Sequence, residues 1–299
     1  MLEEFKHAFN KPNNGHVQLI IINVAVFLVL VTLRVFSDWF GFQDFFASIF
    51  KHFSIPDSFS EFIKRPWTII TYFFTHSLGD LMHILFNMLT LYWFGKLFVE
   101  YLGSDKLISL YVLGGITGAL IYLSAYNLIP NPPEFLRLSS GGGMVGASGA
   151  IFAVMVGAAT LLPDYSFYLL FFGPVKIKYI AAFFIVVSFI GTTGSNAGGN
   201  IAHLGGALMG FVYIKQLQAG VNWGSWITAV LDFFRNLAKP RAKVKVTYRK
   251  TEPAKAKSSS AASKASQAEI DSILDKISDK GYESLTKDEK EKLFNASKK

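Results

Sequence analysis

Long apolar runs separated by short polar segments dominate the first two thirds of the chain. A membrane-spanning helix needs about 20 mostly apolar residues to cross the hydrocarbon core of a bilayer. Six segments meet or approach this length, and they cover residues 17–36, 78–98, 107–128, 146–162, 179–191 and 201–217. The pattern therefore predicts an all-α, polytopic membrane protein with six transmembrane helices.

The composition agrees with a membrane protein. Hydrophobic residues make up 51% of the 299 residues and charged residues only 17%, and the mean hydropathy is +0.35. Because the chain has no Cys, disulfides, thiolate metal sites and a cysteine nucleophile are excluded. No small-residue cleavage site follows the first apolar run, which we therefore expect to be a retained span rather than a signal peptide.

The positive charge of the chain is concentrated after the last span. Residues 235–257 hold nine Lys or Arg and one Glu, and the net charge of the whole chain is +8. The positive-inside rule predicts that this segment is cytoplasmic and attracts anionic lipid. No aromatic stacking platform accompanies it, so nucleic acid is not an expected partner. With six spans, the N-terminus is cytoplasmic too, and the second, fourth and sixth spans run from the outside inward.

Changes in composition predict four parts: a cytoplasmic N-terminus (1–16), a membrane domain (17–217), a basic juxtamembrane segment with a flexible linker (218–268) and a small cytoplasmic helical hairpin (269–299). In the last part, Ile270, Ile273, Leu274 and Ile277 share one helical face. Gly281 is placed to stop this helix. Thr286 and Glu289 form a capping-box pattern that opens a second helix.

Four polar residues lie in the first turns of the three inward-running spans. They are Ser148 in the fourth span, His203 in the sixth, and His83 with Asn87 in the second. Polar side chains are costly inside a membrane, so each needs a structural or functional reason. Because the three spans run in the same direction, the topology predicts that the four side chains lie at a similar depth near the outer face.

Ser148 and His203 have the chemistry of a nucleophile and its base. A serine hydroxyl is a poor nucleophile until a base takes its proton, and an imidazole can do so near neutral pH. The residues around them are small, which lets helices approach closely. We expect close packing of the fourth and sixth spans through Gly146, Gly149, Ala202, Gly206 and Gly210. No Asp or Glu in a span is placed to orient His203, which predicts a dyad rather than a triad.

The start of the fourth span also offers donors for an oxyanion. The first amide groups of a helix have no partner within it, and they carry the positive end of the helix dipole. His83 and Asn87 are four residues apart, so they share a helical face and can add donors. The alternative for this pair is that it joins helices by hydrogen bonds, as polar residues in spans often do.

Several motifs in order make the chain resemble the rhomboid intramembrane serine proteases. The motifs are "GASG" around Ser148, "AHLGG" around His203, "HILFN" from His83 to Asn87, and "VEYLGSDKL" after the second span. The resemblance covers residues 17–217. It implies that Ser148 is the nucleophile, that His203 is the base, and that His83 and Asn87 help to form the oxyanion hole.

Two positions depart from the family pattern. The Trp-Arg pair of the first loop is absent, and the nearest feature is Arg65-Pro66-Trp67. The aromatic residue four positions after the nucleophile is Phe152 instead of Tyr. Phe152 can still stack on His203, but it has no hydroxyl group.

The sequence thus predicts an intramembrane serine endopeptidase that cuts transmembrane helices near the outer face of a membrane. The resemblance implies transmembrane protein substrates in a lipid bilayer, no metal or organic cofactor, and an integral protein of the bacterial inner membrane. One alternative is an inactive rhomboid-like protein that binds or moves membrane proteins, but such proteins are expected to lack the serine or the histidine. Another is a transporter or channel, which would need polar residues through both halves of the membrane.

Overall fold

The computed structural model describes residues 13–138, 142–169, 171–238 and 267–297. The chain divides into two units, Met1–Pro240 and Arg241–Lys299. The first twelve residues of the expected N-terminal segment and residues 239–266 of the expected linker lie outside the described residues.

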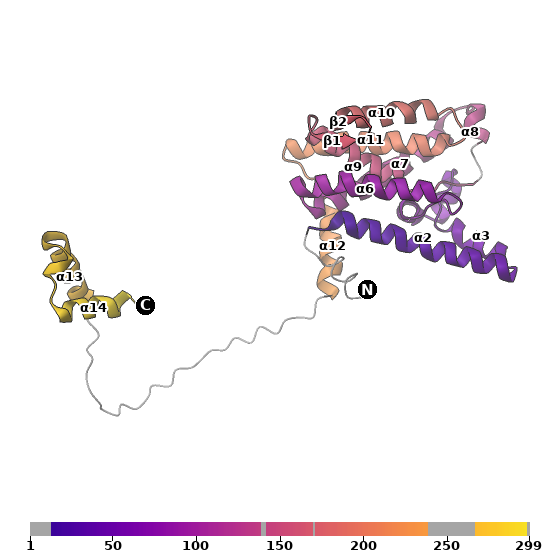
Figure 1. Ribbon diagram of the computed structural model, residues 1–299. Helices are drawn as coiled ribbons and strands as arrows, with labels where there is room; N and C mark the ends of the chain where they lie inside the picture. Colours follow the sequence, from indigo (N-terminus) through magenta and orange to yellow (C-terminus); the bar gives the residue numbers. More distant parts are fainter. Residues whose placement is uncertain (1–12, 139–141, 170, 239–266, 298–299) are drawn as a thin grey trace. The chain divides into compact units, whose positions relative to one another are not determined.

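Six helices occupy the places that the apolar runs predict. They are α2 (Gly15–Phe40), α6 (Leu81–Leu102), α7 (Ser104–Leu128), α9 (Ser148–Leu161), α10 (Ile177–Gly191) and α11 (Ala197–Gln218). In Figure 1, the axes of α2, α6, α10 and α11 are nearly parallel. Among the described residues, α2, α6 and α7 are long and apolar enough to cross a membrane, while α9 and α10 are apolar but shorter. The unit is an all-α polytopic membrane bundle.

The central helix of the bundle is α9. Every residue from Gly149 to Ala159 is buried, and α9 contacts α6, α7, α10 and α11. A helix that is apolar all round belongs inside a protein. Its 14 residues span about 21 Å at 1.5 Å per residue, which is less than the hydrocarbon core of about 30 Å. At least one end of α9 therefore lies below the membrane surface, inside the bundle.

Small residues bring α9 and α11 into close contact. A Cβ atom added to Gly206 would overlap the carbonyl oxygen of Gly149, and one added to Gly210 would overlap the carbonyl oxygen of Ala153. A Cβ atom on Gly149 would lie only 3.2 Å from the carbonyl oxygen of Ala202. The residue Ala202 is buried. The backbones of the two helices approach so closely that side chains larger than these cannot fit between them.

Short helices connect the long ones. The first loop contains α3 (Gln43–Lys51), α4 (Phe59–Lys64), α5 (Thr68–Thr71) and η1 (Tyr72–Phe74), and α8 (Glu134–Leu138) follows α7. Trp39, Phe40 and Phe45 are more than half exposed at the entry to this loop. Exposed aromatic side chains of this kind are typical of the membrane interface.

A β-hairpin and an additional helix in the first unit differ from the expectation. The hairpin is antiparallel and consists of β1 (Ser166–Leu169) and β2 (Gly173–Lys176). Its base is held by Asp164, whose carboxylate pairs with Lys178 and Lys176 at 2.9 Å each. The hydrogen bonds from these two ammonium groups, of which the one from Lys178 has the larger effect, lower the pKa of Asp164 to about 2.

A helix, α12 (Ser225–Ala238), also forms where the sequence predicted only a basic segment and linker.

The C-terminal unit is the helical hairpin that the apolar pattern predicts. It consists of α13 (Gln267–Lys280), η2 (Tyr282–Ser284) and α14 (Lys287–Ser297). Gly281 follows α13 with a φ of 75°, a left-handed conformation that favours glycine. The Thr286 amide donates to Glu289 at 2.7 Å, and the Glu289 amide donates back to the Thr286 hydroxyl at 3.3 Å. These reciprocal bonds confirm the predicted capping box.

Candidate active site

The structure brings Ser148 and His203 into direct contact. Ser148 is the first residue of α9, and His203 lies in the second turn of α11. The hydroxyl oxygen of Ser148 is 2.7 Å from Nε2 of His203. The close packing of α9 and α11 makes this distance possible, because larger residues between the two helices would hold the side chains apart. The pair has the geometry of a nucleophile hydrogen-bonded to its base.

The other ring nitrogen of His203 also has a partner. The hydroxyl oxygen of Ser188, on α10, lies 3.1 Å from Nδ1 of His203, and Ser188 is only 3% exposed. Sequence reasoning missed this residue, because a single serine in an apolar span is usually a packing residue. One signal was available: in the predicted topology α10 runs opposite to α6, α9 and α11, so its C-terminal half is expected at the depth of their starts.

Phe152 fixes the plane of the imidazole. It lies one helical turn after Ser148, and its ring stacks on His203 with the centroids 4.3 Å apart and the planes at 9°. Phe184 of α10 contacts the Phe152 ring edge-on at 6.3 Å. The stacking that the sequence allowed is therefore present without the hydroxyl group of a tyrosine.

Gly146 leaves room beside Ser148. Its φ of 140° is in the region that favours glycine. A Cβ atom at this position would be 3.5 Å from the Ser148 hydroxyl, 3.8 Å from Nε2 of His83 and 4.0 Å from the Ser148 amide nitrogen. We expected Gly146 to pack between helices, but it precedes α9 and faces these polar groups instead. A small group can therefore lie within reach of the Ser148 hydroxyl and two nitrogen atoms.

His83 and Asn87 border the same space. The Asp80 side chain accepts a hydrogen bond from the His83 amide at 3.0 Å and caps the start of α6. A cavity of about 570 Å³ is lined by His83 and Asn87 together with Ser148, Ser188 and His203. The structure thus gathers all four polar residues that the sequence placed at one depth. Among the described residues, no group of three His, Asp or Glu side chains is placed to hold a metal ion.

A second, more polar cavity meets the first one at His83. Its volume is about 350 Å³, and its lining includes Ser77, Asp80, Ser195 and Asn196. His83 and Asp80 line both cavities. Ser77 and Asp80 precede α6, and Ser195 and Asn196 precede α11. This cavity places further polar groups next to the space that contains Ser148 and His203.

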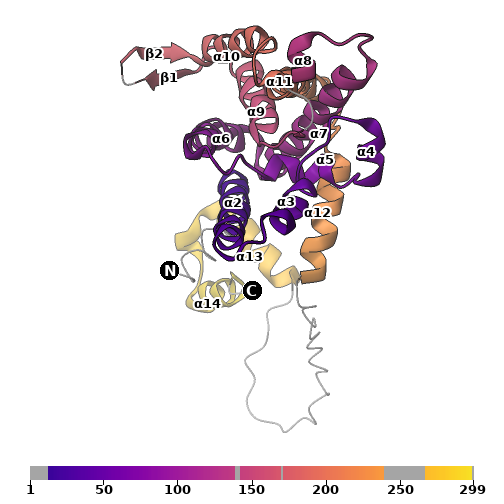
Figure 2. The ribbon, with the colours of Figure 1, turned by 90° about the vertical axis from the view of Figure 1, so that its right-hand side faces the viewer.

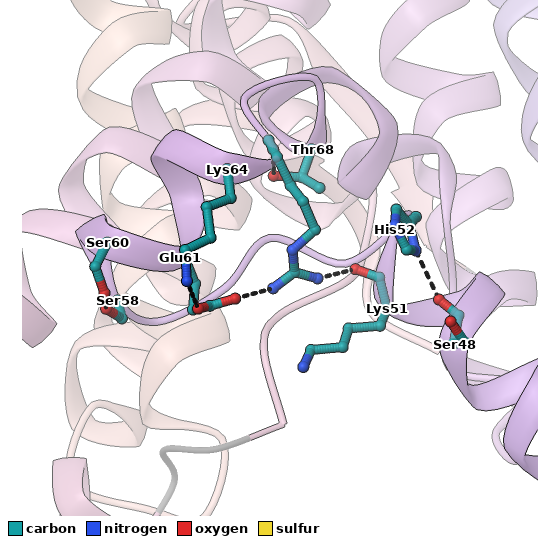
Figure 3. Close-up of polar contacts among 9 residues, drawn as sticks. Ser48, Lys51, His52, Ser58, Ser60, Glu61, Lys64 and Thr68 are labelled. Atoms are coloured by element: carbon teal, nitrogen blue, oxygen red, sulfur yellow. Dashed lines mark hydrogen bonds and ion pairs between the residues drawn. The ribbon is translucent and has the colours of Figure 1, made fainter.

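Arg65 and Trp67 hold the first loop together. The buried Arg65 guanidinium donates to the carbonyl oxygen of Lys51 and lies 3.5 Å from the Glu61 carboxylate, and both of these partners are labelled in Figure 3. The Trp67 indole donates to the next carbonyl group, that of His52, at 3.1 Å, and it stacks on the His52 ring. Although the Trp-Arg order is missing, an arginine and a tryptophan bind two consecutive carbonyl groups of this loop.

Comparison with known proteins gives matches over both units. The rhomboid domain model matches residues 64–218, and a family of unknown function (DUF6576) matches residues 260–299. The first match runs from the end of α4 to the end of α11, so it includes α6, α7, α9, α10 and α11 but leaves out α2. The second match contains the whole C-terminal hairpin.

Three relatives illustrate the similarity. RHOMBOID-like protein 12, mitochondrial, of Arabidopsis thaliana is 34% identical over 68% of this chain and 58% of its own length. Rhomboid protein 1, mitochondrial, of Saccharomyces cerevisiae is 32% identical over 54% of this chain and 49% of its own length. Rhomboid-like protein 16, chloroplastic, of Arabidopsis thaliana is 24% identical over 72% of this chain and 66% of its own length.

The chain spans about half to two thirds of the length of these relatives. The shared region includes the bundle that holds Ser148 and His203, because the rhomboid match runs from residue 64 to residue 218. Since this match covers more than half of the 299 residues, the chain belongs to the rhomboid family.

Proposed function

We propose that the chain is a serine endopeptidase that cuts transmembrane helices of other membrane proteins. The observation that carries the proposal is the 2.7 Å contact between the Ser148 hydroxyl and Nε2 of His203. This contact lies at the end of a short, buried helix and inside a cavity. A serine that served only to pack helices would need neither the histidine nor the empty space.

In the proposed reaction, His203 takes the proton of the Ser148 hydroxyl as the oxygen attacks a peptide carbonyl carbon. The carbonyl oxygen becomes an oxyanion in the space beside Gly146. The Ser148 amide, His83 and Asn87 stabilise its charge by hydrogen bonds. His203 then gives the proton to the departing amine, which leaves an acyl group on Ser148. Water activated by His203 adds to this ester and releases the second product.

Ser188 has the role of a positioning residue in this proposal. A hydroxyl that accepts a hydrogen bond from Nδ1–H of His203 favours the tautomer whose Nε2 lone pair faces Ser148. Phe152 fixes the ring plane, and Ser188 fixes the rotation within that plane. A serine is a neutral acceptor, so it stabilises the imidazolium less than the aspartate of a triad does.

The substrate enters from the lipid phase in this proposal. The 570 Å³ cavity is lined by Phe86 and Val187 as well as by the polar residues. These two side chains are 64% and 47% exposed on the surface of the bundle. The cavity therefore reaches from Ser148 to a surface that lipid contacts. A transmembrane helix that diffuses in the bilayer can meet the site without leaving the membrane.

We also propose that the site lies near the outer face and that both termini are cytoplasmic, on the basis of the basic segment after α11. The names of the three relatives assign those proteins to mitochondria or chloroplasts. They give no support to the expectation of a bacterial inner membrane, and they favour an organellar membrane instead.

The test uses purified protein in lipid vesicles with a fluorophosphonate probe and a transmembrane substrate. We expect the probe to attach to Ser148, as located by mass spectrometry. Ser148→Ala, His203→Ala and the double variant should all cut at the same background rate, because the two residues act as a unit. Elution from a sizing column identical to that of the wild type is the control for folding.

The alternative is a rhomboid-family protein that binds membrane proteins without cutting them. It predicts no labelling of Ser148 and no difference between wild-type protein and Ser148→Ala in any cleavage assay. Robust cleavage by purified Ser148→Ala would also contradict the proposed mechanism, because another group would then have to be the nucleophile.

A further inference from the structure

The helix α12 carries three kinds of side chain on three faces. One face is apolar and exposed, with spacings of four, three, one and three residues: Trp226, Val230, Phe233, Phe234 and Leu237. A second face is turned toward the bundle and contains Ile227 and Arg235. A third face is polar and contains Asp232 and Asn236. Residues with these spacings share one side of a helix, so the division follows from the 3.6-residue period.

The second face fixes α12 to the start of α7. Ile227 is only 5% exposed. The Ser109 hydroxyl donates to the carbonyl oxygen of Gly224 at 3.2 Å, just before α12 begins. Near the other end of α12, Arg235 pairs with Asp105 in the first turn of α7 at 3.1 Å. Two contacts far apart along α12 therefore set its direction.

This direction is across the bundle. In Figure 1, α12 runs across the common direction of α2, α6 and α11, close to the end where α2 begins. In Figure 2, α2 and α6 are seen nearly end-on, whereas α12 is seen from the side. If the long helices cross the membrane, α12 lies parallel to the membrane plane at the level where the spans end.

The exposed face is too apolar for water. Its five large side chains are 48–68% exposed, and they lie together on one side of a single helix. An amphipathic helix that lies in the membrane plane buries such a face about 5–10 Å into the boundary between headgroups and acyl chains. In the sequence, Lys239, Arg241, Lys243 and Lys245 follow the helix directly. Basic residues that are close in sequence to an interfacial helix attract anionic headgroups.

We propose that α12 is an interfacial helix that binds the surface of the bilayer, with its apolar face in the acyl boundary and anionic lipid as its preferred partner. The bilayer fits better than a second copy of the chain, because the orientation of the helix and the charge that follows it are both those of a membrane surface. The proposal does not depend on the proteolytic activity.

The test uses the absence of cysteine in the chain. The full-length variants Phe233→Cys and Asn236→Cys each receive one fluorescent label and are reconstituted in vesicles. Asn236 is the matched control, because it lies on the polar face of the same helix. We expect lipids with a nitroxide near the top of the acyl chain to quench the label at position 233 and to leave the label at 236 almost unaffected. An aqueous quencher should give the opposite order.

A separate quenching experiment tests the preference for anionic lipid. Nitroxide-labelled phosphatidylglycerol should quench the label at 233 more strongly than equally labelled phosphatidylcholine. Changing Lys239, Arg241, Lys243 and Lys245 to Gln should remove this preference. Equal quenching by the aqueous agent at both positions would overturn the proposal, since α12 would then lie in water. Protection of position 233 from both kinds of quencher would overturn it too, because protein would then cover the face.

Discussion

The hydroxyl oxygen of Ser188 lies 3.1 Å from Nδ1 of His203, while the hydroxyl oxygen of Ser148 lies 2.7 Å from Nε2 of the same ring. The imidazole thus joins two serines that belong to different helices, α10 and α9. Because the two nitrogen atoms of a neutral imidazole have opposite roles, a donor role at Nδ1 fixes an acceptor role at Nε2. The Ser188 contact therefore bears directly on whether His203 can act as a base.

We predict that Ser188→Ala lowers kcat of peptide cleavage and leaves KM nearly unchanged. A neutral hydrogen bond contributes about 1 kcal/mol, which corresponds to a loss of about fivefold. Ser188→Thr keeps the hydroxyl group and should retain more activity than Ser188→Ala. If Ser188 only packed between helices, Ser188→Ala would lower the stability of the protein and leave kcat unchanged. Steady-state kinetics and thermal unfolding of the same samples separate the two cases.

His83 and Asn87 should each matter for the rate without being indispensable. Removing one oxyanion donor typically slows a reaction by about a hundredfold to a thousandfold. We expect His83→Ala and Asn87→Ala to fall in this range, because the Ser148 amide remains as a donor. If both variants cleave at the wild-type rate but unfold at lower temperature, the pair joins helices and does not stabilise an oxyanion.

The packing of α9 against α11 predicts a strong effect at Gly206. In Gly206→Ala, the new methyl group would overlap the carbonyl oxygen of Gly149, so the helices must separate. Overpacking of this kind costs about 1–3 kcal/mol, and it would also move His203 away from Ser148. Thermal unfolding in detergent and cleavage rates measure the two effects. Gly79→Ala is the control, since nothing lies within 4 Å of its Cβ position.

The orientation in the membrane can be tested with single cysteines, because the chain has none of its own. We predict that Ser60→Cys, in the first loop, reacts with a membrane-impermeant maleimide when the protein is expressed in the inner membrane of intact bacterial cells. Ser258→Cys, after the basic segment, should react only once the membrane is opened. The reverse result would place the dyad near the opposite face and would remove the basis for substrate cleavage at the outer boundary.

The sequence predicted the spans and most of the site because both depend on position along a helix. Ser148, His203, His83 and Asn87 are polar residues in apolar spans, and the alternating direction of the spans sets their depth. Phe152 was expected from the resemblance to the rhomboid proteases, which have an aromatic residue four positions after the serine. These relationships are local, so the chain itself carries them.

Other features depend on how the helices are rotated about their axes. Nothing around Ser188 indicates that its side chain faces His203 rather than lipid, because α10 is apolar on all sides. Residues 166–176 form a hairpin although their apolar run is equally compatible with the start of a helix. The helix α12 was not predicted for a different reason. Its apolar spacing is present in the sequence, but the basic residues after it led to the prediction of a juxtamembrane segment and linker.

Substrate choice should depend on how easily a transmembrane helix unwinds next to Ser148. The nucleophile lies at the start of a buried helix, beside the narrow space that Gly146 leaves open. Only a carbonyl group that is free of helical hydrogen bonds and of large neighbouring side chains can enter this space. Within a stable helix, the carbonyl groups are bonded and shielded. We therefore predict cleavage near the outer membrane boundary, next to small residues, in helices that contain Gly or Pro.

These two residues lower the cost of unwinding by about 1 kcal/mol for Gly and about 3 kcal/mol for Pro, relative to Ala. In a series of substrates, replacing each Gly and Pro near the outer end of the span by Leu should lower the cleavage rate stepwise, with Pro→Leu having the larger effect. Matched Gly→Leu changes in the inner half of the span are the control, and they should have little effect. Mass spectrometry locates the cut. Undiminished cleavage of the all-Leu helix, or cuts in the inner half, would show that unwinding at the outer boundary does not select the substrate.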